Sequence, residues 1–169
     1  MDLRAAVLKE HTKKQCRLIV NYIGENPDRF AKLMKLFFSG EYRVTQRAGW
    51  PMSYCVQNHP SLIHPYYKKM MAFLKRKDVH PSVERNILRL LQKVEIPQRW
   101  RGEVMNSCFE YISDPNAAIA VKAFSLSVLE NLSAIYPEIL PELKLIIQER
   151  WDNETAAFRS RAKKILKKI

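Results

Sequence analysis

Glycine and cysteine are scarce in this chain of 169 residues. Only four residues are glycine, which argues against glycine-rich phosphate loops and dinucleotide-binding turns and disfavours sheet-rich folds. The three cysteines, Cys16, Cys55 and Cys108, are odd in number and widely spaced, so they form no disulfide framework and indicate a reducing compartment. No apolar run approaches the roughly 18 residues of a membrane span, and no signal peptide is readable. We therefore expect a cytoplasmic protein without a membrane segment.

Basic residues are in excess over acidic ones. Lys plus Arg number 29 against 17 Asp plus Glu, which gives a formal net charge of +12. This excess favours an anionic partner, nucleic acid before a membrane surface. The chain is also 47% hydrophobic, enough for a real core, which argues against wholesale disorder.

Proline-containing turns divide the chain into segments of helical length. Between marks such as Asn26-Pro27, His59-Pro60 and Ile96-Pro97, apolar residues recur at spacings of three and four, the period of a helix. Strand-like alternation is absent. The sequence predicts a single domain over 1–169, with an N-terminal helix at 2–23 and helical hairpins at about 27–58, 61–94, 98–134 and 138–168.

The second helices of the predicted hairpins share an apolar stripe. Two of them are apolar at offsets 0, 4, 7, 8 and 11, namely Val83, Ile87, Leu90, Leu91 and Val94, then Phe158, Ala162, Ile165, Leu166 and Ile169. Val44 and Ile119 begin less complete copies, and the four anchors are 39, 36 and 39 residues apart. This period predicts an all-α fold, an α-solenoid of about four HEAT-like hairpins with an N-terminal helix. The alternative is a non-repeating helical bundle with coincidental spacing.

The sequence adds a family resemblance. The whole chain, and especially the ending ETAAFRSRAKKILKKI with YPEILPELKLI before it, resembles a small bacterial family of HEAT-like repeat proteins. Some members carry the name adenylosuccinate lyase, but the residues here do not support that activity, because the true lyases have a Gly/Ser-rich signature loop. The resemblance implies how the helices pack, and it implies no particular activity.

Residues with catalytic or metal-binding chemistry form no recognisable site. Cys55 and His59 are four residues apart, but a zinc site needs a third ligand, and Cys55 lies in the apolar stripe. No GxSxG motif and no Cys/His nucleophile setting is present. We therefore predict no catalytic residue, no metal and no cofactor.

One fold analogy could still imply catalysis. HEAT-like alkylpurine DNA glycosylases hold DNA on a basic concave face, with Trp and a carboxylate near the lesion. Trp50 is placed to act as a groove aromatic, but no Asp or Glu accompanies it, so a glycosylase-like repair enzyme is the least favoured hypothesis. Pro51 is expected to kink or break the helix that carries Trp50.

A basic face is the remaining functional signal. Positions that point away from the stripe on the four second helices hold many cations and no acid. The candidate anion-binding residues are Arg43, Arg47, Arg85, Arg89, Lys122, Arg161 and Lys164. Arg47, Asn86, Lys122 and Arg161 share one offset, so they should form a row across stacked repeats.

Three interpretations of this face stay open. The first is a non-catalytic module that binds nucleic acid, or another polyanion, through phosphate contacts. The second is a protein–protein interaction scaffold whose basic face meets an acidic protein. The third is an ordinary solvated surface of long polar side chains.

Overall fold

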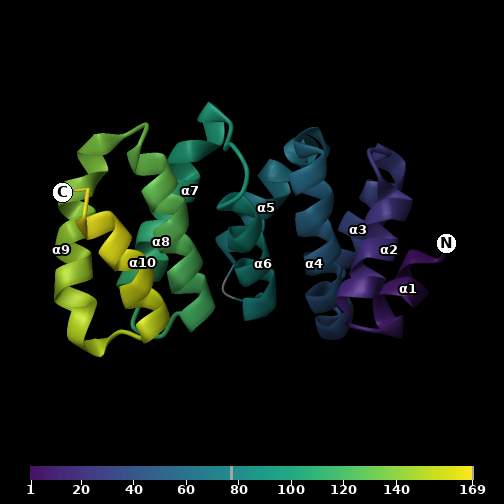
Figure 1. Cartoon of the computed structure of the whole chain (residues 1–169), viewed down its shortest axis with the longest axis horizontal. Coiled ribbons are helices and arrows are strands. Elements are labelled where there is room, and N and C mark those ends of the chain that lie inside the picture. Colours follow the sequence, from purple (N-terminus) through teal and green to yellow (C-terminus); the bar gives the residue numbers. More distant parts are fainter. Residues whose placement is uncertain (77, 169) are drawn as a thin grey trace. The chain divides into compact units, whose positions relative to one another are not determined.

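The chain folds into helices joined by short loops. The computed structural model describes residues 1–76 and 78–168, and no strand occurs among them (Figure 1). The molecule divides into two compact parts, unit 1 (Met1–Val94) and unit 2 (Glu95–Ile169). Within the described residues, no helix is both long enough and apolar enough to cross a bilayer.

Unit 1 is a succession of paired helices. Its elements are α1 (Leu3–Lys9), α2 (Lys13–Ile23), α3 (Pro27–Phe37), α4 (Tyr42–Asn58), the 3-10 helix η1 (Pro60–Tyr66), α5 (Tyr67–Leu74) and α6 (Pro81–Leu91). Helix α1 packs on α2, α3 on α4, and α5 on α6. The second helices are also neighbours, because α4 contacts both α2 and α6.

The expected single helix over 2–23 is wrong. The structure has two helices there, and the Thr12 hydroxyl accepts a hydrogen bond from the Gln15 N–H at 3.1 Å to start the second one. Asp2 caps the first helix in the same way, as short polar residues commonly do. Helices α1 and α2 therefore form an additional hairpin, and α2 joins α4 and α6 as a second helix.

Pro51 was expected to kink or break its helix, and the structure contradicts the break, because α4 continues through this proline to Asn58. Gly49, two residues earlier, lies directly against Asn86 of α6. A Cβ atom at this glycine would overlap the Asn86 amide, so the close approach of α4 and α6 depends on having no side chain at this position.

The apolar stripe predicted from the repeat forms much of the core. In unit 1, Val44, Met52, Ile87 and Leu90 are buried, as are Phe158, Ala162 and Ile165 in unit 2. Val94 and Leu166 are half-buried, and the stripe position Ile169 lies outside the described residues.

Unit 2 contains a helix that is covered on more than one side. Its elements are α7 (Gln98–Ser113), α8 (Ile119–Ser133), η2 (Pro137–Ile139), α9 (Leu140–Arg150), η3 (Trp151–Asn153) and α10 (Ala156–Leu166). Because α8 packs on both α7 and α10, it is also buried at positions outside the predicted stripe, namely Val121, Val128 and Leu129. Ile119, the predicted anchor, is 56% exposed instead.

Candidate functional site

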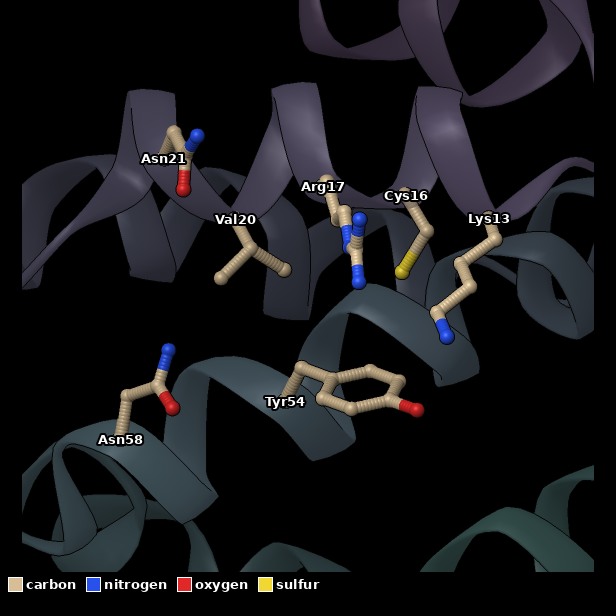
Figure 2. Close-up of a pocket in the computed structure, with 7 residues that line it drawn as sticks. All are labelled: Lys13, Cys16, Arg17, Val20, Asn21, Tyr54 and Asn58. Atoms are coloured by element: carbon tan, nitrogen blue, oxygen red, sulfur yellow. The ribbon is translucent and has the colours of Figure 1, made fainter.

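A basic groove lies between α2 and α4 in unit 1. It has a volume of about 400 Å³ and is lined by Lys13, Cys16, Arg17, Val20, Asn21, Tyr54 and Asn58. Figure 2 shows Lys13 and Arg17 reaching from α2 toward the Tyr54 ring on α4, with Asn21 and Asn58 farther along. Lys13, Arg17 and Asn21 are each four residues apart, so they form one line on α2. The lining carries two cations and no acid.

A second group of cations acts on His11, which lies in the loop between α1 and α2. Burial lowers the pKa of His11, and the positive charges of Arg47, Arg85 and Arg89 lower it further. The His11 ring lies against Trp50, with 5.2 Å between the ring centroids. Arg47 is held in place by its Nη1, which donates a hydrogen bond to the Leu8 carbonyl at 2.6 Å. We call Arg47, Arg85 and Arg89 the arginine cluster.

The groove and the arginine cluster adjoin. Arg89 acts electrostatically on Cys16 in the groove as well as on His11. On α4, Arg47 of the cluster and Tyr54 of the groove are seven residues apart, which places them on one face of the helix. Together the five cations Lys13, Arg17, Arg47, Arg85 and Arg89 form what we call the basic surface of unit 1.

The positive potential of this surface is not cancelled locally. Among residues 1–76 and 78–168, none of its five cations forms an ion pair with a carboxylate. Arg85 and Arg89 are half-buried on α6, where charges are screened less than in open solvent. An anion that binds here therefore gains from several cations at once.

Two further candidates in unit 1 lie beside this surface. Arg43 is exposed on the first turn of α4, one turn before Arg47. Trp50, predicted as the groove aromatic, is half-buried against His11 and does not line the groove. The aromatic residue that does line the groove is Tyr54, one turn farther along α4.

Lys122, predicted to contact phosphate, is instead part of the interior of unit 2. Its Nζ lies 2.8 Å from Glu154 Oε1, and the two side chains are 6% and 1% exposed. Arg150 Nη2 donates to the same oxygen at 2.8 Å. Burial by itself would raise the pKa of Glu154, but the hydrogen bonds and charges of Lys122 and Arg150 outweigh burial and lower it. The carboxylate is therefore ionised, and Lys122 forms a buried ion pair with it.

Asn86, another member of the predicted row of residues at one offset, is also buried and cannot belong to an exposed row. This side chain is buried, and its Nδ2 donates to the Ser82 carbonyl at 2.8 Å. In unit 2, Arg161 donates from Nε to Ser127 Oγ at 3.1 Å, and its guanidinium lies 5.6 Å from the Phe124 ring centroid. Lys164 is exposed on α10. Of the row, only Arg47 belongs to the basic surface.

The cysteines are unsuited to nucleophilic chemistry at neutral pH. Burial raises the pKa of Cys16 to about 11, that of Cys55 to about 12 and that of Cys108 to about 12. Each is therefore a protonated thiol, whereas the thiolate is the reactive form. No group of three or more His, Cys, Asp or Glu side chains in the described part of the chain is arranged to hold a metal ion.

Sequence reasoning missed Lys13, Arg17 and Tyr54. A single N-terminal helix over 2–23, as the sequence predicts, does not place Lys13 and Arg17 on a second helix of a hairpin. A signal was available: Thr12, Cys16, Ile19, Val20 and Ile23 follow the stripe offsets 0, 4, 7, 8 and 11. Thr12 is a common residue at a helix start, and it marks the break.

Comparison with known proteins gives one positive result. A family model described as a HEAT repeat domain matches residues 3–169, and neither the curated proteins nor the solved structures contain a match. The match confirms the predicted all-α solenoid class, and it makes the protein a repeat scaffold of the kind whose stacked helices present extended binding surfaces. The chain belongs to the HEAT repeat family.

Proposed function

We propose that unit 1 binds nucleic acid through its basic surface. The observation that carries the proposal is the groove between α2 and α4, which is lined by Lys13 and Arg17 and by no acid. Arg47, Arg85 and Arg89 add to its positive charge, since all three act electrostatically on His11 and Arg89 also acts on Cys16 in the groove. Repeating phosphates are the natural partner of several cations that come from three neighbouring helices.

Electrostatics supplies the binding energy in this proposal. Like charges that are grouped on one surface repel one another in the free protein, and a bound phosphate relieves that repulsion. Each neutralised phosphate also releases condensed counterions, which makes the affinity fall steeply with salt. An arginine can bind two phosphate oxygens with its planar fork, and the Leu8 contact already orders one of the three guanidiniums.

An acidic protein is the second partner class that such a surface could attract, since HEAT repeats commonly act as interaction scaffolds. Carboxylates on a folded protein are held at fixed positions, whereas the phosphates of a nucleic-acid strand follow one another along a continuous backbone. The two partner classes are separated by competition with an acidic polypeptide.

The experiment compares two double variants that lose equal charge. Arg85→Ala/Arg89→Ala removes two cations of the basic surface, and Lys32→Ala/Lys35→Ala removes two exposed lysines of α3. Fluorescence anisotropy with a labelled single-stranded oligonucleotide is recorded across a sodium chloride series. We expect the first variant to flatten the plot of log affinity against log salt by about 0.7 for each lost phosphate contact.

The second variant should keep the wild-type slope. The proposal fails if the wild type does not bind the oligonucleotide at low salt, or if both variants change the slope equally. Displacement of the oligonucleotide by polyglutamate at matched charge concentration would favour an acidic protein as the partner.

A further inference from the structure

The groove between α2 and α4 contains more than phosphate binding requires. Tyr54 leaves 38% of its surface exposed and lies beside the apolar Cys16 and Val20. The amides of Asn21 and Asn58 lie at the other end from the Lys13 ammonium (Figure 2). A groove of about 400 Å³ is within the size range of small-ligand sites. It therefore combines a flat aromatic surface, two amides and two cations.

These groups match the parts of a nucleotide. An aromatic ring stacks on any base, because every base has a π-face, and basic side chains next to the ring hold the neighbouring phosphates. An asparagine amide both donates and accepts hydrogen bonds, so it can pair with the edge of any base. The lining offers no carboxylate that would repel a phosphate.

A groove between two packed helices is easier for an unpaired base to enter than for a paired one. In a duplex, both faces of a base are stacked and its pairing edge is occupied, so the base cannot enter a space between two packed helices. An unpaired base can leave its stack and reach an aromatic side chain. Tyr54 lines the groove, whereas the arginine cluster can meet the backbone of either form.

We infer that this groove receives one unpaired nucleotide of a single-stranded nucleic acid. The base lies on Tyr54, the amides of Asn21 and Asn58 face its edges, and Lys13 and Arg17 hold the adjacent phosphates. The inference rests on the proposed function and extends it by naming the class of strand.

The test measures anisotropy of a fluorescein-labelled oligothymidylate, alone and in a duplex with oligoadenylate. We expect the wild type to prefer the single strand. Tyr54→Ala should weaken single-strand binding by between about 5-fold and 150-fold, the range for loss of one base–aromatic stack, and should leave duplex binding nearly unchanged. Tyr54→Phe keeps the ring and should bind like the wild type.

Tyr42→Ala is the matched control, because Tyr42 is also an exposed tyrosine of α4 and is absent from the groove lining. It should bind like the wild type. If circular dichroism shows that Tyr54→Ala does not fold, Arg17→Gln replaces it and should weaken single-strand binding and flatten its salt dependence.

The outcomes separate the two proposals. If the wild type binds single strand and duplex equally and Tyr54→Ala changes neither, the inference is overturned while the proposed function stands. If the wild type binds neither form at low salt, the proposed function itself fails. Thymidine monophosphate is the competitor: displacement of the strand at an equal nucleotide concentration would make the groove a mononucleotide site and overturn the assignment of a strand.

Discussion

The buried ion pair of unit 2 allows a sharp stability prediction. Glu154→Gln removes the negative charge with almost no change in size and leaves the Lys122 ammonium, 6% exposed, opposite a neutral amide. Removing one partner of a buried pair typically costs about 3–5 kcal/mol, because the other charge stays buried without compensation. Arg150 also loses its partner, but its side chain is 17% exposed and can turn to water. We therefore expect the free energy of unfolding to fall by about 3 kcal/mol, the low end of that range.

The same carboxylate predicts a dependence on pH. The pKa of Glu154 is lowered in the folded protein from the ordinary value of 4.5, so the unfolded chain binds a proton more readily than the folded one. Its contribution to stability is therefore present above pH 4.5 and is lost as the pH falls through the lowered folded value. In Glu154→Gln this acid-side loss should disappear from the pH profile of stability.

Urea unfolding, with hydrogen exchange of residues 95–168 to localise the effect, measures both predictions. Glu130→Gln is the matched control, because Glu130 pairs with Lys168 at 3.0 Å while the two side chains are 22% and 47% exposed. Such solvated pairs contribute at most about 1 kcal/mol. If Glu154→Gln were no more destabilising than Glu130→Gln, the interpretation of Lys122 as a structural residue would be refuted.

Three further predictions concern unit 1. Gly49→Ala should destabilise by about 1–3 kcal/mol in urea unfolding, because the new methyl group overpacks against the buried Asn86; the double variant with Asn86→Ala should recover part of that loss. Leu90→Ala should cost about 2–5 kcal/mol in the same assay, since this side chain is fully buried, and a loss below about 1 kcal/mol would contradict its core position. The pKa of His11 is lowered by burial and by the arginine cluster, and bound phosphates would offset those charges and raise it. Binding should therefore take up a proton, so oligonucleotide affinity measured by anisotropy should rise as the pH falls from 8 toward 5.5, and His11→Gln should abolish this trend.

The periodic part of the fold was predictable from the sequence. An apolar side chain at Ile87 or Ile165 lies on a stripe that recurs with each hairpin, and burial of that stripe is the main reason why neighbouring helices pack. The first hairpin was harder to predict, because its two helices are short and the break between them is marked by a single capping residue, Thr12. A continuous basic and apolar pattern across that break is compatible with one long helix.

Helix α8 shows why periodicity alone gave a wrong orientation. The segment from Ile119 to Ser133 has only two charged residues, Lys122 and Glu130, and a helix that is apolar nearly all round is buried on several sides. Anchoring the stripe at Ile119 assumed that one face was open. The composition of the helix was evidence against an open face, but the partner of Lys122 comes from 32 residues later in the chain, and no local pattern identifies it.

Lysine and arginine occur both on the basic surface and in the interior of the protein. Whether such a cation has a binding role or a structural role therefore depends on its location. Charge reversal at Lys122 would place a second carboxylate beside buried Glu154, so a loss of binding in that variant would report unfolding of unit 2. Arg47 belongs to the basic surface but also has a structural role, because its hydrogen bond to Leu8 connects α4 to the end of α1. Arg85 and Arg89 have no such structural bond within the described residues and act on His11 through their charge. Variants at these two arginines change the potential of the basic surface while the packing that carries it is retained, which is why they are the substitutions that can separate binding from folding.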